Sequence, residues 1–125
     1  MNTINIEQLI QFHRKIVKET GGSEGIRDIT LVESALNKAF LTFDGKELYE
    51  GKIKKIAVIS YSLIKNHGFI DGNKRIGIAT MLLLLRLNEI RLEYTQNELI
   101  ELGLKVAEGL LKEIDIEEWI VQHRV

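Results

Sequence analysis

The sequence of 125 residues contains neither cysteine nor proline. Without cysteine the chain cannot form a disulfide framework, a thiolate zinc site or a cysteine nucleophile, and this fits a reducing compartment. The sequence also lacks an excess of charge of either sign, because 17 Lys and Arg residues balance 18 Asp and Glu residues and leave a net charge of -1. No overall basic field would therefore recruit nucleic acid or an anionic membrane, although a local patch could still act.

Long apolar runs are absent as well. The longest uncharged apolar stretch extends from Ile76 to Leu85 and ends at Arg86. A membrane-spanning helix needs roughly 20 such residues, so this stretch is interpreted as a buried core helix. At the N-terminus, Glu7 precedes any basic residue and no apolar secretory segment follows. We therefore expect a cytoplasmic protein without a membrane partner.

The spacing of apolar residues predicts an all-α fold, a single domain over residues 1–125 with about six helices around a central apolar helix. Five of the expected helices cover residues 6–20, 31–43, 53–66, 96–110 and 116–120, and the fourth along the chain is apolar nearly all round from residue 76 to residue 87. Only residues 90–94 indicate a short extended segment. Four helix starts are marked by pairs typical of capping boxes: Asn5 with Gln8, Thr30 with Glu33, Thr95 with Glu98, and Asp115 with Glu118.

Chemically active side chains concentrate between the third and fourth expected helices, in residues 67–75, which read HGFIDGNKR. The first turn of a helix has unpaired amides, and its dipole favours an anion. Gly72 lets a ligand approach that backbone, and Arg75 offers a planar fork for phosphate oxygens. Lys74 adds a compact charge, and Asn73 either holds the turn or donates to a phosphate. These residues predict a polyphosphate site at the start of the fourth helix.

The same segment carries a carboxylate and an imidazole. Asp71 supplies the hard oxygen donor that Mg²⁺ prefers beside nucleotide phosphates. His67 is mostly neutral at pH 7 and can take a proton from an attacking hydroxyl. Phe69 is expected to anchor the loop in the core. Taken singly, each polar residue also has a purely structural reading as a helix cap or a solvated side chain, but two cations in a first helical turn oppose the dipole and favour a bound anion.

The pattern H-x-F-x-D-G-N-K-R resembles the signature of the Fic/Doc family, and lysine before the arginine resembles its Doc branch, the death-on-curing toxins. Gly-Ile-Arg-Asp at residues 25–28 and Leu-Val-Glu-Ser-Ala-Leu at residues 31–36 are similar to the N-terminal half of the family. Val-Ala-Glu-Gly at residues 106–109, followed by Trp119, is similar to its C-terminal end. One departure is Gly68, where the family commonly has proline.

The resemblance implies an activity and a role for each matching residue. A Doc-type toxin transfers the γ-phosphate of ATP to a threonine of elongation factor Tu, and an antitoxin inhibits it by docking its C-terminal segment beside the active site. His67 is then the general base, Asp71 holds Mg²⁺ on the nucleotide, and Phe69 fixes the loop. Nucleic acid is contacted only through the antitoxin. The residues that would line the anion pocket are Gly72, Asn73, Lys74 and Arg75.

Two other functions stay open at this point. Fic proteins transfer AMP to a protein hydroxyl and carry a small residue where Lys74 stands, so the lysine favours a kinase over AMP transfer. A non-catalytic module that binds an antitoxin through the same groove is the other alternative. No Walker motif and no dinucleotide-binding glycine pattern occurs in the sequence, so a nucleotide pocket is expected only at this loop.

Several other features have a less specific interpretation. Residues 21–25 match a G-x-S-x-G nucleophile elbow around Ser23, and residues 20–25 match an inhibitory helix found in Fic proteins. Adjacent glycines make a helix costly there, so a loop is expected. His13 is interpreted as a core histidine and His123 as a solvated one. Residues 42–51 are the candidate flap that aligns a target backbone in the family.

Overall fold

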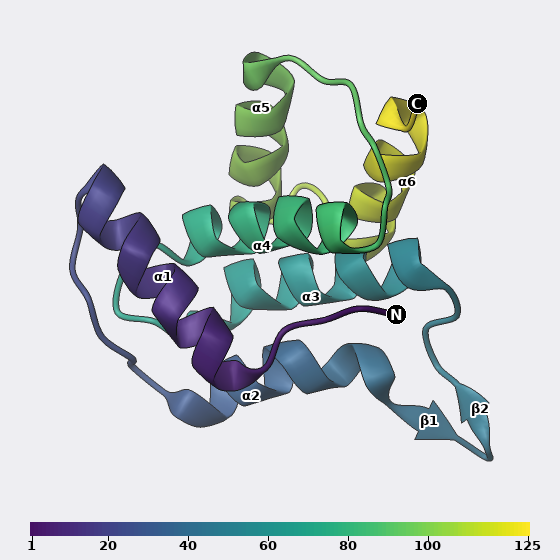
Figure 1. Ribbon diagram of the computed structural model, residues 1–125, viewed down its shortest axis with the longest axis horizontal. Coiled ribbons are helices and arrows are strands. Elements are labelled where there is room, and N and C mark those ends of the chain that lie inside the picture. The colour runs from purple at the N-terminus through teal and green to yellow at the C-terminus, as the bar shows by residue number, and fades with distance from the viewer.

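Two helices of 15 residues, α3 (Lys52–Asn66) and α4 (Asn73–Leu87), form the centre of the fold. The computed structural model describes residues 1–125, and α3 and α4 share its most extensive helix contact. They lie side by side in Figure 1. Their backbones approach closely at Gly77, where a methyl group would lie 3.0 Å from the carbonyl oxygen of Ser60 and would overlap Ile64. The Ser60 hydroxyl donates to the Gly77 carbonyl at 3.0 Å and ties the two helices together.

Four further helices surround this pair (Figure 1). They are α1 (Ile6–Thr20), α2 (Ile29–Asn37), α5 (Gln96–Ala107) and α6 (Glu113–His123). A short 3-10 helix at Lys38–Phe40 follows α2. Apolar side chains from all six α-helices form one buried core, which confirms the predicted all-α architecture around the apolar α4. None of the helices is long and apolar enough to cross a membrane.

The predicted starts of α1 and α5 are confirmed by reciprocal capping boxes at Asn5 and Thr95. The predicted start of α2 is wrong, because Asp28 rather than Thr30 is the cap. The Asp28 carboxylate accepts both the amide and the hydroxyl of Thr30, so the helix begins at Ile29. Helix α6 also begins earlier than predicted, since Asp115 occupies its third position and accepts the cap amide of Lys112.

A β-hairpin replaces the predicted end of the second helix. Strands β1 (Thr42–Phe43) and β2 (Lys46–Glu47) pair antiparallel. Asp44 and Gly45 link them with positive φ angles of 52° and 75°, as a two-residue Asp-Gly hairpin turn requires. Phe43, the last residue of the predicted helix, is 75% exposed. A predicted extended segment at residues 90–94 forms only one isolated bridge, between Leu92 and Arg124.

The C-terminal end of α6 is fastened to the start of α5 by His123, so the prediction of a solvated histidine is wrong. Its Nδ1 lies 2.7 Å from the Trp119 carbonyl oxygen and its Nε2 lies 2.8 Å from Glu98 Oε2. The ring also stacks on Trp119, with centroids 4.1 Å apart. The bond to Glu98 raises the pKa of His123. The same bond lowers the pKa of Glu98 to about 2.

This pair predicts a pH-dependent stability. Glu98, with a depressed pKa, contributes above its ordinary value of 4.5 and loses that contribution as the pH falls toward about 2. His123, with a raised pKa, contributes fully below 6.5 and loses that contribution as the pH rises above it. The stability that Glu98→Gln removes should therefore be largest between about pH 4.5 and 6.5, measured by urea unfolding at several pH values.

Glutamine keeps the capping box at position 98, so this variant removes mainly the ionic bond. Glu101→Gln is the matched control, because it removes an ion pair of the same helix, with Lys105, that does not involve a histidine. A loss for Glu98→Gln that is equal at pH 5.5 and pH 9 would contradict the assignment.

Candidate functional site

The segment between α3 and α4 turns sharply at His67. This residue ends α3 in the left-handed conformation, with φ 52° and ψ 46°, and is exposed. The turn is held from outside, because Arg27 Nε donates to the His67 carbonyl oxygen at 2.7 Å. The amides of Arg27 and Asp28 donate to the Gly68 carbonyl at 2.8 and 3.0 Å. The segment before α2 thus supports a backbone conformation that is unfavourable for a residue with a side chain.

Phe69 of the bend lies in the core. It is 1% exposed and stacks on His13 of α1, with ring centroids 3.8 Å apart and planes at 11°. Its backbone is fastened by Asn73, which accepts the Phe69 amide at 3.1 Å and donates to the Phe69 carbonyl at 3.0 Å. The Asn73 side chain therefore holds the turn. Because its oxygen and its nitrogen are both engaged there, only the backbone amide of Asn73 is left for a ligand.

The start of α4 is open. Gly72 precedes the helix with φ 75° and ψ 20°, and no side chain caps the first turn. The amides of Asn73, Lys74 and Arg75 have no acceptor within the protein, since the first helical bond is donated by Ile76. A helix start with unpaired amides is a binding site for anions, with the positive end of the dipole directed at the ligand.

Asp71 stands directly before this helix, with a side chain 46% exposed. Its Oδ2 accepts the Ser23 amide at 3.1 Å and its Oδ1 accepts the Gly72 amide at 2.8 Å. Arg75 Nη2 lies 3.6 Å from Oδ1. The bond from Ser23 is the largest of the interactions that hold the pKa of Asp71 below its ordinary value. The side chain is therefore ionised at neutral pH and has a partly open face.

The two cations of the first turn differ in their surroundings. Lys74 is exposed and forms no ion pair, while its aliphatic stem passes within 4 Å of where a methyl group on Gly103 of α5 would be. Arg75 Nη1 donates to Thr20 Oγ1 at 2.6 Å and to the carbonyl oxygen of Gly21. These acceptors belong to the C-terminal end of α1, where a cation is favourable. Lys74 is thus free for a ligand, and Arg75 has a structural role in addition to any phosphate contact.

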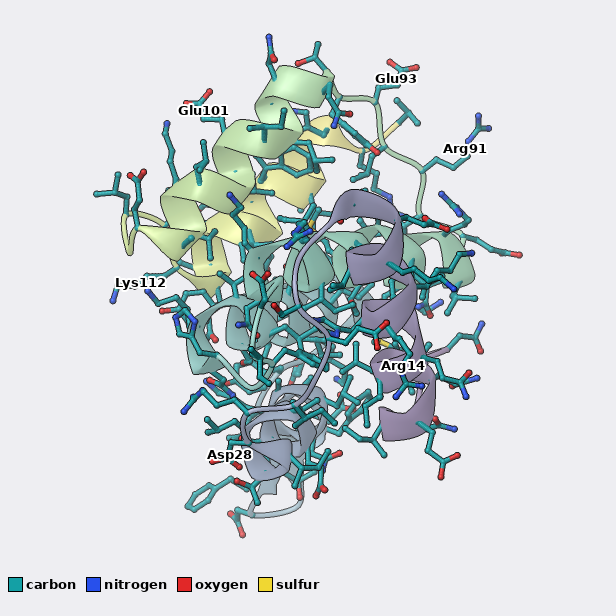
Figure 2. All side chains as sticks on the ribbon, turned by 90° about the vertical axis from the view of Figure 1, so that its left-hand side faces the viewer. Arg14, Asp28, Arg91, Glu93, Glu101 and Lys112 are labelled. Carbon is teal, nitrogen blue, oxygen red and sulfur yellow. The ribbon has the colours of Figure 1, made fainter.

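Residues 21–25 form a loop, as predicted, although Thr20 is still the last residue of α1, and this loop lies against the site. A methyl group on Gly22 would lie 2.5 Å from Asp71 Oδ2 and 2.9 Å from Arg75 Nη2. Figure 2 looks at this side of the molecule, where the segment between α1 and α2 runs down to Asp28. The sequence did not predict this contact, because it joins residues about 50 positions apart. Ser23 contributes its backbone amide, and no catalytic partner contacts its hydroxyl.

An apolar groove opens beside the two cations, between α1, α4 and α5. Its volume is about 380 Å³, within the usual range for ligand sites. Lys74, Arg75 and Thr20 lie at its polar part. The rest of its lining is mostly apolar and comprises Ile16, Ile78, Ala79, Leu82, Leu99 and Ile100, together with Gln96 and Gly103.

The hairpin does not join this site. Lys55, in the first turns of α3, is buried and donates to the carbonyl oxygen of Tyr49, and it pairs with Glu47 at 3.2 Å. The hairpin is thereby fastened to the start of α3, whereas His67 ends that helix (Figure 1). A helix of 15 residues is about 22 Å long. The structure therefore does not place residues 42–51 next to the motif, as a flap over the site would require.

The close approach of Gly22 to Asp71 and Arg75 predicts that substitutions at Gly21 and Gly22 differ in their effect on stability. Gly21→Ala and Gly22→Ala both put a side chain on a residue with positive φ, 87° and 118° respectively. Only the second would also collide with Asp71 and Arg75, since nothing lies within 4 Å of a methyl group on Gly21. Because the colliding atoms are the ends of flexible side chains that can shift, Gly22→Ala should lower the free energy of unfolding by only about 0.5–1.5 kcal/mol more than Gly21→Ala, measured by urea titration. If both variants lost the same free energy of unfolding, the contact of Gly22 with Asp71 and Arg75 would not contribute to stability.

Comparison with known proteins places the chain in a family. The family model described as Fic/DOC family matches residues 3–85, which include the whole motif segment. The chain is also similar to a protein named Toxin Doc from Mycolicibacterium smegmatis, with 30% identity over 94 residues. That alignment covers 75% of this chain and 68% of the relative. The chain therefore belongs to the Fic/DOC family.

Proposed function

We propose that the chain is a Doc-type toxin of a toxin–antitoxin pair that transfers the γ-phosphate of ATP to a threonine or serine hydroxyl of a protein target. The start of α4 carries the proposal, because three unpaired amides lie there beside an ionised carboxylate and an unpaired lysine. Phosphoryl transfer asks a protein mainly to position its reactants and to neutralise charge. This arrangement can do both without a P-loop.

In this proposal, the phosphates of ATP lie on the amides of Asn73, Lys74 and Arg75. The helix dipole and the Lys74 ammonium both favour that charge. Lys74 also supports a kinase over an AMP transferase, because the branch of the family that transfers AMP has a small residue at this position. The groove beside Lys74 has room for an organic group next to the phosphates.

Asp71 is the residue that we assign to Mg²⁺. No cluster of three or more His, Cys, Asp and Glu side chains able to hold a metal occurs in the structure. A single carboxylate fits Mg²⁺, which usually takes one or two carboxylates together with nucleotide phosphates and water. When bound, the ion neutralises negative charge on the phosphates. Asp71 remains ionised at neutral pH and keeps an exposed face for this contact.

His67 is the proposed general base. It is exposed at the end of α3, where the hydroxyl of a large protein target can reach it. The target oxygen forms a bond to the γ-phosphorus while the bond from that phosphorus to the β–γ bridging oxygen breaks. ADP leaves, and the hydroxyl proton moves to the His67 imidazole. Support from Arg27 and Asp28 fixes the backbone of this bend and so limits the positions open to the imidazole.

Two protein partners follow from this proposal. The target is elongation factor Tu, and the inhibitor is a cognate antitoxin whose C-terminal segment docks near the active site. The apolar groove between α1, α4 and α5 supports the second part, since an amphipathic segment can place its apolar face there. Nucleic acid is then contacted only indirectly, through the antitoxin.

One observation favours a non-catalytic module as the second candidate. Asp71 and Arg75 already have partners in the end of α1 and the loop after it, at residues 20–23, so the free protein has no need of a nucleotide to satisfy them. Such a module would bind its antitoxin and leave ATP unused.

Labelled ATP separates these functions. The protein should transfer label to purified elongation factor Tu from ATP labelled at the γ position and not from ATP labelled at the α position. His67→Ala should lose transfer by at least about a hundredfold, because general-base catalysis contributes roughly that much. Label from the α position would instead establish AMP transfer. Growth arrest that persists unchanged with His67→Ala would identify a non-catalytic function.

The two cations predict different outcomes on substitution. Lys74→Ala should weaken ATP binding roughly tenfold, the equivalent of about 1.4 kcal/mol, and leave the thermal midpoint unchanged because the lysine has no protein partner. Arg75→Ala should weaken binding and also lower the midpoint, since it removes the bonds to Thr20 and Gly21. Lys15→Ala on exposed α1 surface is the charge-matched control, and calorimetric titration measures the affinity. Unchanged ATP affinity in both site variants would exclude the phosphate assignment.

A further inference from the structure

His13 lies in the middle of α1 and contacts the motif bend, although 54 positions or more separate them in sequence. The side chain is 2% exposed. Its ring stacks on Phe69, and its Nε2 lies 2.7 Å from the carbonyl oxygen of Asp71. A carbonyl oxygen can only accept a hydrogen bond, so Nε2 carries the proton and donates. The prediction of a buried core histidine is confirmed, but the polar contact goes further than packing.

The contact fixes the peptide group between Asp71 and Gly72. In a planar trans peptide the C=O and the following N–H point in opposite directions. With the Asp71 carbonyl held by His13, the Gly72 amide is directed the other way, where it donates to Asp71 Oδ1 at 2.8 Å. The imidazole also lies close to the glycine itself, since a methyl group on Gly72 would be 3.5 Å from Nε2. One hydrogen bond from α1 therefore orients both the peptide and the carboxylate.

A different orientation of this peptide would oppose ligand binding. If the group rotated, a carbonyl oxygen would replace the N–H beside the first turn of α4. Its partial negative charge would face the position where the amides of Asn73 to Arg75 receive an anion. The Asp71 carboxylate would also lose the Gly72 amide that now holds Oδ1.

We propose that His13 is a positioning residue of the active site, which holds the Asp71–Gly72 peptide so that the Asp71 carboxylate faces Mg²⁺ and the start of α4 presents only donors to the phosphates. The ligand part of this inference rests on the proposed function. The structural part, that the His13 donor orients the peptide, does not depend on it.

Two substitutions isolate the donor. His13→Gln and His13→Met both remove the ring and have unbranched side chains of similar length, but only glutamine can donate to the Asp71 carbonyl. Amide hydrogen exchange, followed by NMR, should show the Gly72 amide exchanging at least about tenfold faster in His13→Met than in the wild type. In His13→Gln the rate should stay within about threefold of the wild type.

A titration of Mg²⁺ at fixed ATP concentration, followed by calorimetry, provides the second measurement. The Mg²⁺ concentration for half-maximal binding should rise roughly tenfold in His13→Met and stay within about threefold in His13→Gln. Methionine suits a buried position better than glutamine, so lost stability cannot produce this order. Leu9→Val, a fully buried change one turn earlier on α1, is the control for weakened packing.

The outcomes are distinct. Equal exchange rates of the Gly72 amide in the two His13 variants would overturn the positioning role. The role would also be overturned if the Mg²⁺ concentration for half-maximal binding rose in every variant, Leu9→Val included, in step with the fall of its thermal midpoint. If the wild-type protein binds no ATP with Mg²⁺, the proposed function fails and with it the ligand part of this inference. The exchange of the Gly72 amide still decides in that case whether His13 orients the peptide.

Discussion

The site depends on the uncapped start of α4. Helices α1, α2 and α5 each begin at a residue whose side chain accepts an amide of the first turn, namely Asn5, Asp28 and Thr95. Helix α4 begins after Gly72, which has no side chain to do so, and three of its amides are left without an acceptor. Helix α3 begins in the same way after Gly51, but only the start of α4 follows directly on the motif that carries His67 and Asp71. Because α4 is packed in the centre of the fold, these amides cannot move far to find a partner. The fold thus holds a fixed set of donors at the surface, which is what an anion site needs.

Local chemistry explains which parts of the fold were predictable. The caps at Asn5 and Thr95 are pairs three residues apart, so the sequence alone predicts the starts of α1 and α5. At α2 two polar residues compete for the same role, and Asp28 is the cap because its carboxylate binds the Thr30 hydroxyl that would have capped the helix. The hairpin was missed because Phe43 continues an apolar helical spacing, although Asp44 and Gly45 form a strong turn.

The candidate site was predictable as a list of residues and not as a set of contacts. Motif residues lie within nine positions, and their types alone indicate an anion and a metal. Their supporting partners come from elsewhere in the chain. His13 and Gly22 reach the bend through the packing of α1, and nothing in their local sequence distinguishes them from a core histidine and a loop glycine. Long-range contacts of this kind are set by the fold.

Arg75 connects the C-terminal end of α1 with Asp71. Its Nη1 is bound to the C-terminal end of α1, while its Nη2 lies 3.6 Å from Asp71. A phosphate on the α4 amides would compete with Thr20 and Gly21 for the same guanidinium, and a metal on Asp71 would compete with the Ser23 amide. Each of these bonds is charge-assisted, and the side chains of Asp71 and Arg75 are both partly exposed to solvent. A ligand at the start of α4 and the anchoring of residues 20–23 therefore depend on the same two side chains, Asp71 and Arg75.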